Sequence, residues 1–181
     1  MNRLYRLRGL LVPVIGAIAA CGDGDNNTLS GCLESFASKD AIALSLTSSP
    51  ACSVHDAFLS VDGERESYAS LEFPAGGCVQ DFGATLFDPD QFSGGNVGVF
   101  VALPASLAPN VQVTLKTWLD GSLQDSSLNH GGTLVTTTDQ AEGKYYSFPT
   151  DLPFDEVNLE IGASGSATGG TVRVYEFCAN R

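Results

Sequence analysis

The sequence predicts a single all-β domain, folded as an antiparallel β-sandwich and cross-linked by two disulfides. Alternating or wholly apolar runs are short throughout the chain, and Gly, Pro, Asn or Asp residues separate them. The runs recur about every 8–12 residues, a spacing typical of sandwiches and barrels. Four cysteines follow residue 31, and an even number suits the disulfide framework of an exported protein: Cys32, Cys52, Cys78 and Cys178.

The expected strands follow one another from residue 41 to residue 178. Residues 32–50 are the least clear part, because they allow one or two helical turns as well as a strand over 41–46. Asp120-Gly121 lies between alternating runs and predicts a tight hairpin, since type I′ turns require positive φ, and Asp62-Gly63 resembles it. The remaining expected strands are 53–61, 66–73, 79–87, 97–103, 111–119, 122–128, 133–138, 144–148, 156–161 and 171–178.

The residue patterns of two of these strands also predict how each strand is buried. Residues 97–103 are apolar on both faces, which favours a central strand. Residues 156–161 alternate, so Val157, Leu159 and Ile161 are expected to point into the core. We expect this strand to form the last hairpin with 171–178, closed around the glycine-rich segment 162–170.

The N-terminus carries the features of an export signal. Three arginines precede an apolar run over residues 10–20, which is too short for a bilayer core that needs about 20 residues. The run ends in Ile18-Ala19-Ala20-Cys21, which resembles the lipobox of bacterial lipoproteins. The resemblance implies cleavage before Cys21, lipidation of its thiol and a membrane anchor of several acyl chains. It places the protein in the cell envelope, and Gly22 after the cysteine favours the outer membrane, facing the periplasm or the surface.

The chain then divides into a leader over 1–20, a polar tether over 21–31 and a sandwich domain over 32–181. Removing the leader from 181 residues leaves 161, enough for one domain with its own core. The leader holds three of the nine basic residues and none of the 21 acidic ones, so six remain against 21, a charge of −15. Such a charge repels phosphate backbones and excludes nucleic acid, while glycans, cations and cationic partners stay admissible.

The four remaining cysteines allow three pairings, and sequence alone does not decide among them. The favoured arrangement joins Cys32 to Cys52 and Cys78 to Cys178, which would tie the last strand to the middle of the domain. Structural zinc is disfavoured, because the chain has no C-x-x-C pair and its two histidines lie far apart.

The C-terminal part resembles a family of binding modules. Residues 153–161 and Thr171-Val-Arg-Val-Tyr-Glu-Phe-Cys178 are similar to the closing strands of galactose-binding-like jelly-roll modules. The resemblance implies a jelly roll and a carbohydrate- or surface-binding role, often with a structural calcium ion. No ligand motif of that family can be matched here residue by residue.

One strand carries the candidate binding residues. Along 111–119, period-two geometry places Trp118, Lys116 and Gln112 together on the polar face. An indole there can stack on a sugar ring, while the other two side chains hydrogen-bond its hydroxyls. The alternative is a ring covered by a neighbouring strand or loop, since aromatic residues also stabilise sheets through cross-strand pairs.

Candidates for metal binding and catalysis are few. Asp88 and Asp90 lie in a loop whose carboxylates and carbonyls suit calcium, although Asx turns explain the same residues; no other cofactor is expected. The only imidazoles are His55 and His130. His55 and the adjacent Asp56 would point to opposite faces of a strand, and His130 lies in a predicted turn.

These observations predict a non-catalytic, lipid-anchored envelope protein that presents a binding or adhesion surface, with a glycan as one candidate ligand. The first alternative is a structural or accessory subunit of an envelope complex that binds no small ligand. The second is a hydrolase that uses two carboxylates, a signal of little specificity in a chain with 21 acidic residues.

Overall fold

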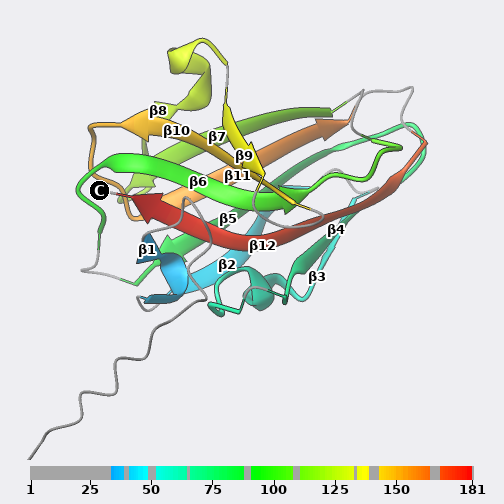
Figure 1. Cartoon of the computed structure of the whole chain (residues 1–181), viewed down its shortest axis with the longest axis horizontal. Coiled ribbons are helices and arrows are strands. Elements are labelled where there is room, and N and C mark those ends of the chain that lie inside the picture. The colour runs from blue at the N-terminus through cyan, green and yellow to red at the C-terminus, as the bar shows by residue number, and fades with distance from the viewer. Residues whose placement is uncertain are drawn as a thin grey trace, which may run out of the picture.

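The computed structural model describes most of the chain after its first 33 residues. Nothing is described for 1–33, 39–40, 49–51, 65, 88–90, 108–110, 133, 139–142, 164–167 and 181. The described residues form two antiparallel sheets and short 3₁₀ turns, and no α-helix occurs among them (Figure 1). The prediction of an all-β sandwich is therefore confirmed.

The first sheet has seven strands in the order β3-β4-β12-β6-β10-β9, with β1 pairing the end of β12. The second has five, in the order β2-β5-β11-β7-β8. The first sheet comprises β1 (Glu34–Ser35), β3 (Ser53–His55), β4 (Ala69–Phe73), β6 (Gly95–Ala102), β9 (Val135–Thr138), β10 (Lys144–Thr150) and β12 (Gly170–Asn180). The second comprises β2 (Ala41–Ser48), β5 (Val79–Leu86), β7 (Val111–Leu119), β8 (Ser122–Ser126) and β11 (Glu156–Ala163).

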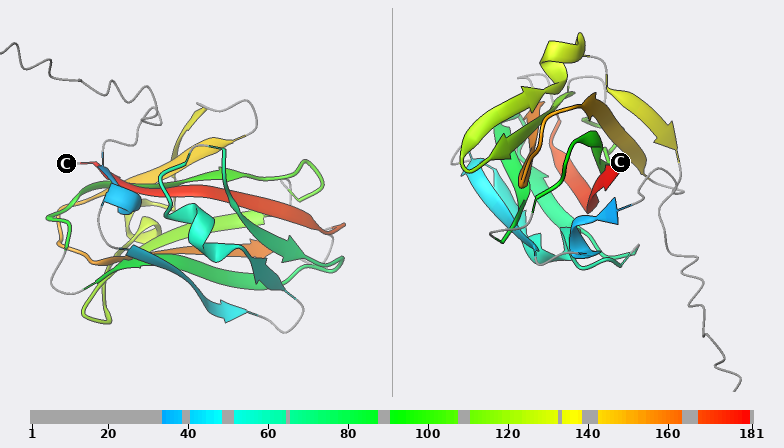
Figure 2. Two further views of the ribbon diagram at one scale, coloured as in Figure 1. Left: turned by 90° about the horizontal axis from the view of Figure 1, so that it is seen from below. Right: turned by 90° about the vertical axis from the view of Figure 1, so that its left-hand side faces the viewer.

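Successive strands mostly alternate between the two sheets. The chain passes from β4 to β5 to β6 to β7 by crossing the sandwich each time, and it crosses again from β10 to β11 and from β11 to β12. The end-on view in Figure 2 shows the two sheets facing each other around the interior. In this order the last strand, β12, lies between β4 and β6 in the seven-stranded sheet.

Most of the predicted strands are found close to their expected positions. The strand over 111–119 coincides with β7, and 97–103 overlaps β6 over residues 97–102. β6 lies between β12 and β10 as a central strand should. Asp120-Gly121 joins β7 to β8 with φ values of 49° and 72°, the positive pair that a type I′ turn requires. Val157, Leu159 and Ile161 are all fully buried, as predicted.

Three local predictions are wrong. The expected strand 53–61 stops at His55, because Asp56 adopts a left-handed conformation and caps the 3₁₀ turn η2 (Ala57–Ser60). Asp62-Gly63 consequently lies in a long connection between β3 and β4, not in a tight hairpin. The expected last hairpin does not form, because β11 pairs with β5 and β7 while β12 pairs with β4 and β6 in the other sheet.

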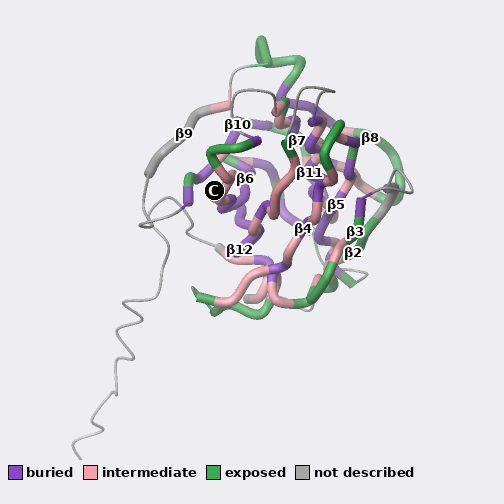
Figure 3. Tube along the Cα trace, turned by 90° about the vertical axis from the view of Figure 1, so that its right-hand side faces the viewer, coloured by how far each residue is buried: buried purple, intermediate pink, exposed green. Residues whose placement is uncertain are grey.

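The hydrophobic core fills the space between the sheets. Figure 3 shows the buried positions running along the strands, with exposed positions mainly in the peripheral connections. A chain of contacting rings crosses this core: Phe36 lies 4.9 Å from Phe92 and 6.3 Å from Phe177, and Phe92 lies 5.3 Å from Phe154. The 3₁₀ turn η1 (Phe36–Ser38) thus supplies an anchoring side chain from a region where the sequence pattern was ambiguous.

A second buried cluster lies on the outer face of the seven-stranded sheet. It consists of Phe100, Tyr145, Tyr175 and Cys178, with Tyr68 and Ala102 partly buried against it. The ring of Tyr145 lies tilted against Phe100, with 4.7 Å between the ring centres, and also covers Gly98, where a Cβ would collide with it. Glycine at this strand position therefore makes room for an aromatic ring.

Replacing Gly98 with alanine is expected to lower the free energy of unfolding by about 1–3 kcal/mol, the usual cost of overpacking. The added methyl group would collide with a ring that is only 3% exposed. Urea unfolding of the full chain measures this loss. The double variant that also carries Tyr145→Leu should recover part of it, and no loss in the single variant would contradict the packing described.

The described disulfide joins Cys52 to Cys78, with 6.3 Å between the Cα atoms. This overturns both favoured pairings, Cys32–Cys52 and Cys78–Cys178. Cys52 precedes β3 in one sheet and Cys78 precedes β5 in the other, so the strand layout brings them together. Cys178 is buried and is also disulfide-bonded, with its partner outside the described residues; Cys32 lies outside them as well.

Candidate functional site

The outer face of the five-stranded sheet carries the predicted binding strand. Core residues of β7, β11 and β5 point into the sandwich, so the alternate positions point outward. The pairing register then aligns two rows across all five strands. One row is Ile42, Thr85, Glu156, Trp118 and Leu123, and the next is Leu44, Gly83, Asn158, Lys116 and Ser126.

Trp118 is half-buried in the first row, between Glu156 on β11 and Leu123 on β8. Its indole Nε1 is buried and has no hydrogen-bond partner, so the part of the ring that reaches solvent is carbon. Leu123, its neighbour on β8, is 53% exposed. The row therefore offers an apolar surface beside polar side chains, the combination that carbohydrate sites use.

The charges on this face are unevenly paired. Lys116 Nζ lies 2.7 Å from Glu160 Oε2, so these two groups neutralise each other. Burial, opposed by a hydrogen bond from Asn158 and reinforced by the charge of Asp155, raises the pKa of Glu156 above its ordinary value. No ion pair involves Glu156 in the described part of the chain, so its charge remains available beside Trp118.

The three predicted binding residues share a face, as expected, but they do not form one site. Lys116 is two residues from Trp118, whereas Gln112 is six residues away, about 20 Å along an extended strand. Gln112 is exposed and lies opposite Gly162 near the other end of β7. Glu156 and Asn158, which are nearer to Trp118, were not singled out from the sequence, because only the register of β11 against β7 places them there.

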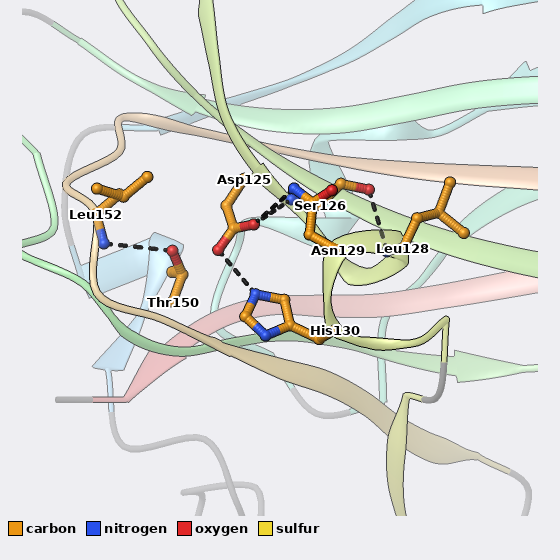
Figure 4. A network of polar contacts seen from close by, with 7 residues as sticks. All are labelled: Asp125, Ser126, Leu128, Asn129, His130, Thr150 and Leu152. Carbon is orange, nitrogen blue, oxygen red and sulfur yellow. Dashed lines mark hydrogen bonds and ion pairs between the residues drawn. The ribbon is translucent and has the colours of Figure 1, made fainter.

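A second polar cluster surrounds Asp125, at the end of β8 (Figure 4). Its carboxylate accepts hydrogen bonds from the amide of Ser126 at 2.8 Å, from Asn129 Nδ2 at 3.1 Å and from His130 Nε2 at 2.9 Å. The hydroxyl of Thr150 on β10 adds a fourth. Burial alone would raise the pKa of Asp125, but these bonds outweigh it and lower the pKa to about 2.

This cluster has the geometry of a structural clamp. The donors come from the 3₁₀ turn η4 (Ser127–His130) and from β10, so one carboxylate ties an edge strand to the opposite sheet. A nucleophilic triad needs a hydroxyl or thiol on the second ring nitrogen of the histidine. In the part of the chain that the structure describes, His130 bonds to Asp125 and contacts the ring of Phe148 at 5.5 Å, and no hydroxyl or thiol there bonds to its second ring nitrogen.

The other predicted site residues fall into two groups. Within the described residues, His55 bonds to the hydroxyl of Ser53 at 3.2 Å and joins no larger polar cluster. Cys21, Asp88 and Asp90 lie outside the described residues, so lipidation and calcium binding stay predictions. Within the described ranges, no group of three or more His, Cys, Asp or Glu side chains is placed to hold a metal ion.

A hollow of about 390 Å³ lies on the other sheet, where β6 and β12 approach the loop after Ala102. Arg173 lines it and places its guanidinium 4.9 Å from the centre of the Tyr68 ring. Thr171 lines it as well and donates a hydrogen bond to Glu72. The polar groups that surround this hollow thus have partners within the protein.

Comparison with known proteins gives no family. No family model matches the chain, and no curated protein matches it. Among solved structures, the enzymatically active domain of bacteriophage CBA120 tailspike protein 4 is similar over 83% of this chain, at 11% identity and a TM-score of 0.41. The Agl-KA catalytic domain is similar over 81%, at 12% identity and a TM-score of 0.34. The chain covers only 20% and 28% of those two chains, and likeness at this level carries no functional conclusion.

Among the described residues, no helix has the length and apolar character needed to cross a bilayer.

Proposed function

We propose that this protein is a lipid-anchored envelope protein that binds glycans on the outer face of its five-stranded sheet. The observation that carries the proposal is the position of Trp118. Its exposed carbon surface lies in a row of side chains across five strands, between a carboxylate and an exposed leucine. Stacking on such a surface, together with hydrogen bonds from flanking polar groups, is how proteins commonly hold sugar rings.

Replacing Trp118 with alanine should abolish retention of the full chain on a polysaccharide array, because it removes the stacking surface. Phe58→Ala is the matched control, since Phe58 is 63% exposed on η2 and belongs to no part of the proposed site. The control should bind like the unchanged protein. Equal retention of the Trp118 variant and the control would refute glycan binding at this face.

The anchor is proposed from the lipobox alone. Cys21 would carry the lipid, which leaves Cys32 as the partner of the disulfide-bonded Cys178. Two or more acyl chains suffice for stable attachment, at about 0.8 kcal/mol per buried CH₂.

Peptide mass spectrometry of the membrane-derived protein should find an acylated N-terminal Cys21 and a disulfide-linked peptide pair that contains Cys32 and Cys178. Cys21→Ser should move the protein from the membrane fraction to the soluble fraction. An intact Met1 together with an unmodified Cys21 would show that the anchor does not exist.

The two alternatives make different predictions. An accessory subunit of an envelope complex would yield a stoichiometric partner when cross-linked in membranes, and Trp118→Ala would leave that partner in place. A carboxylate hydrolase needs two acids facing each other, and the register does set Glu160 opposite Asp81. Lys116 already binds Glu160, which argues against its service as a proton donor.

A further inference from the structure

We propose that the glycan bound at Trp118 carries a free, protonated amine, as in an amino sugar that is not N-acetylated. This inference rests on the proposed function and names the class of its ligand. It comes from the charges next to the indole ring, which favour a cation over a neutral or anionic sugar.

Glu156 places a carboxylate beside the indole ring. It lies directly opposite Trp118 on the neighbouring strand, where paired residues have Cβ atoms about 4.5–5.5 Å apart. Among the described residues, the side chain that hydrogen-bonds to it is that of Asn158, a neutral group. The nearest lysine on this face, Lys116, is held by Glu160. A ligand seated on Trp118 therefore meets a carboxylate that no cation in the described part of the chain neutralises.

The indole ring of Trp118 also favours a cation. The face of an indole attracts cations, and the attraction grows when a carboxylate stands beside it. An ammonium group between Trp118 and Glu156 would gain both interactions and would supply the charge-assisted hydrogen bond that Glu156 lacks. A carboxylate or sulfate on the sugar would be repelled by the same group.

The interior position of β7 in its sheet favours a sugar over a basic peptide. Extended peptides commonly join a sheet at an exposed strand edge, where their backbone finds partners. Trp118 lies on β7, an interior strand whose backbone is already paired with β11 and β8. The site therefore offers side chains only, which suits the hydroxyls and amine of a sugar ring.

The test uses the intrinsic fluorescence of Trp118, because it is the only tryptophan in the chain. The full chain, purified in detergent, is titrated at pH 6 with hexamers of β-1,4-linked glucosamine and of β-1,4-linked N-acetylglucosamine. The glucosamine hexamer should bind about tenfold more tightly, the usual worth of a hydrogen bond to a charged group. In Glu156→Gln this preference should fall to near equality.

Glu64→Gln is the matched control, because it removes the same charge from an exposed loop residue. The neighbouring Gly63 donates a hydrogen bond to Glu176, which places this loop at the other sheet. It should keep the tenfold preference. An unchanged preference in Glu156→Gln, or equal binding of both hexamers to the unmodified protein, overturns the amine inference and leaves glycan binding standing. If neither hexamer alters the fluorescence but poly-lysine does, the ligand is a protein, and glycan binding fails as well.

Discussion

Asparagine in place of Asp125 is expected to lower the free energy of unfolding by about 2–3 kcal/mol at pH 7. The amide keeps the shape of the carboxylate but turns one acceptor into a donor. The NH₂ group of the new amide then faces the donor of Asn129, His130 or Thr150. Water can relieve this conflict only in part, because the carboxylate is only 12% exposed in the folded protein. Because these bonds join β8 and η4 to β10, the loss weakens the contact between the two sheets.

The same substitution should change how stability depends on pH. The pKa of Asp125 is about 2 in the folded protein against an ordinary 3.8, so the ionised group favours the folded state. That contribution, about 2 kcal/mol, is complete above pH 5 and is lost as the pH falls through 4 to 2. Wild-type and Asp125→Asn stabilities should therefore converge near pH 2.

Urea midpoints measured between pH 2 and pH 7 test this prediction. Asp151→Asn is the control, because Asp151 is an exposed carboxylate in the loop after β10. If the gap between wild type and Asp125→Asn stays constant across this range, the clamp does not act through its charge.

Glutamine in place of Glu176 should have the opposite effect and stabilise the protein at high pH. Glu176 lies on β12 with 3% of its surface exposed, accepting hydrogen bonds from the Ser35 hydroxyl at 2.6 Å and the Gly63 amide at 3.2 Å. Burial is the main cause that raises its pKa to about 7, and the nearby charge of Asp62 adds to it. The folded protein therefore holds this carboxyl in its protonated form more strongly than the unfolded chain does.

Because proton binding is linked to folding, the difference between the folded and unfolded pKa of Glu176 sets how its contribution to stability changes with pH. With a pKa of about 7 folded and 4.5 unfolded, the favourable contribution of Glu176 is complete below pH 4.5 and is lost as the pH rises through 7. Glutamine is neutral at every pH and can keep bonds to Ser35 and Gly63. The free energy of unfolding of Glu176→Gln should exceed that of the wild type by about 3 kcal/mol at pH 8 and match it near pH 4.

Urea unfolding at those two pH values measures the difference, with Glu64→Gln as an exposed control. A variant that is less stable than the wild type at pH 8 would show that the ionised carboxylate is well accommodated. Since Glu176 holds β1 and η1 against β12, amide exchange in residues 34–38 should slow in the variant at pH 8.

The local sequence pattern was sufficient wherever a strand buries one face. The alternation in β7 and β11 sets which side chains enter the core, because a one-residue shift would expose every apolar group on the strand. It was insufficient at Asp56, where a single left-handed residue ended the expected strand, and at β11 and β12, which resemble a hairpin but belong to different sheets.

The candidate site shows the same division. Trp118 and Lys116 could be placed on one face from the sequence, because both lie on a single strand. Glu156 could not, because it is 38 residues away and only the antiparallel register brings it beside the indole. The pairing of His130 with Asp125 was missed for a related reason, since the 3₁₀ turn that folds the ring back is not encoded by alternation.

By itself, the sequence determined the β class, the inward and outward faces of the main strands, the Asp120-Gly121 turn and the acidic charge, since each depends on near neighbours in the chain or on composition. Only the tertiary structure decided the order of strands in each sheet, the Cys52–Cys78 bond and the companions of Trp118. The physical reason is that these depend on contacts between segments far apart in the chain, whose pairing is selected by packing of the whole core and not by any local preference.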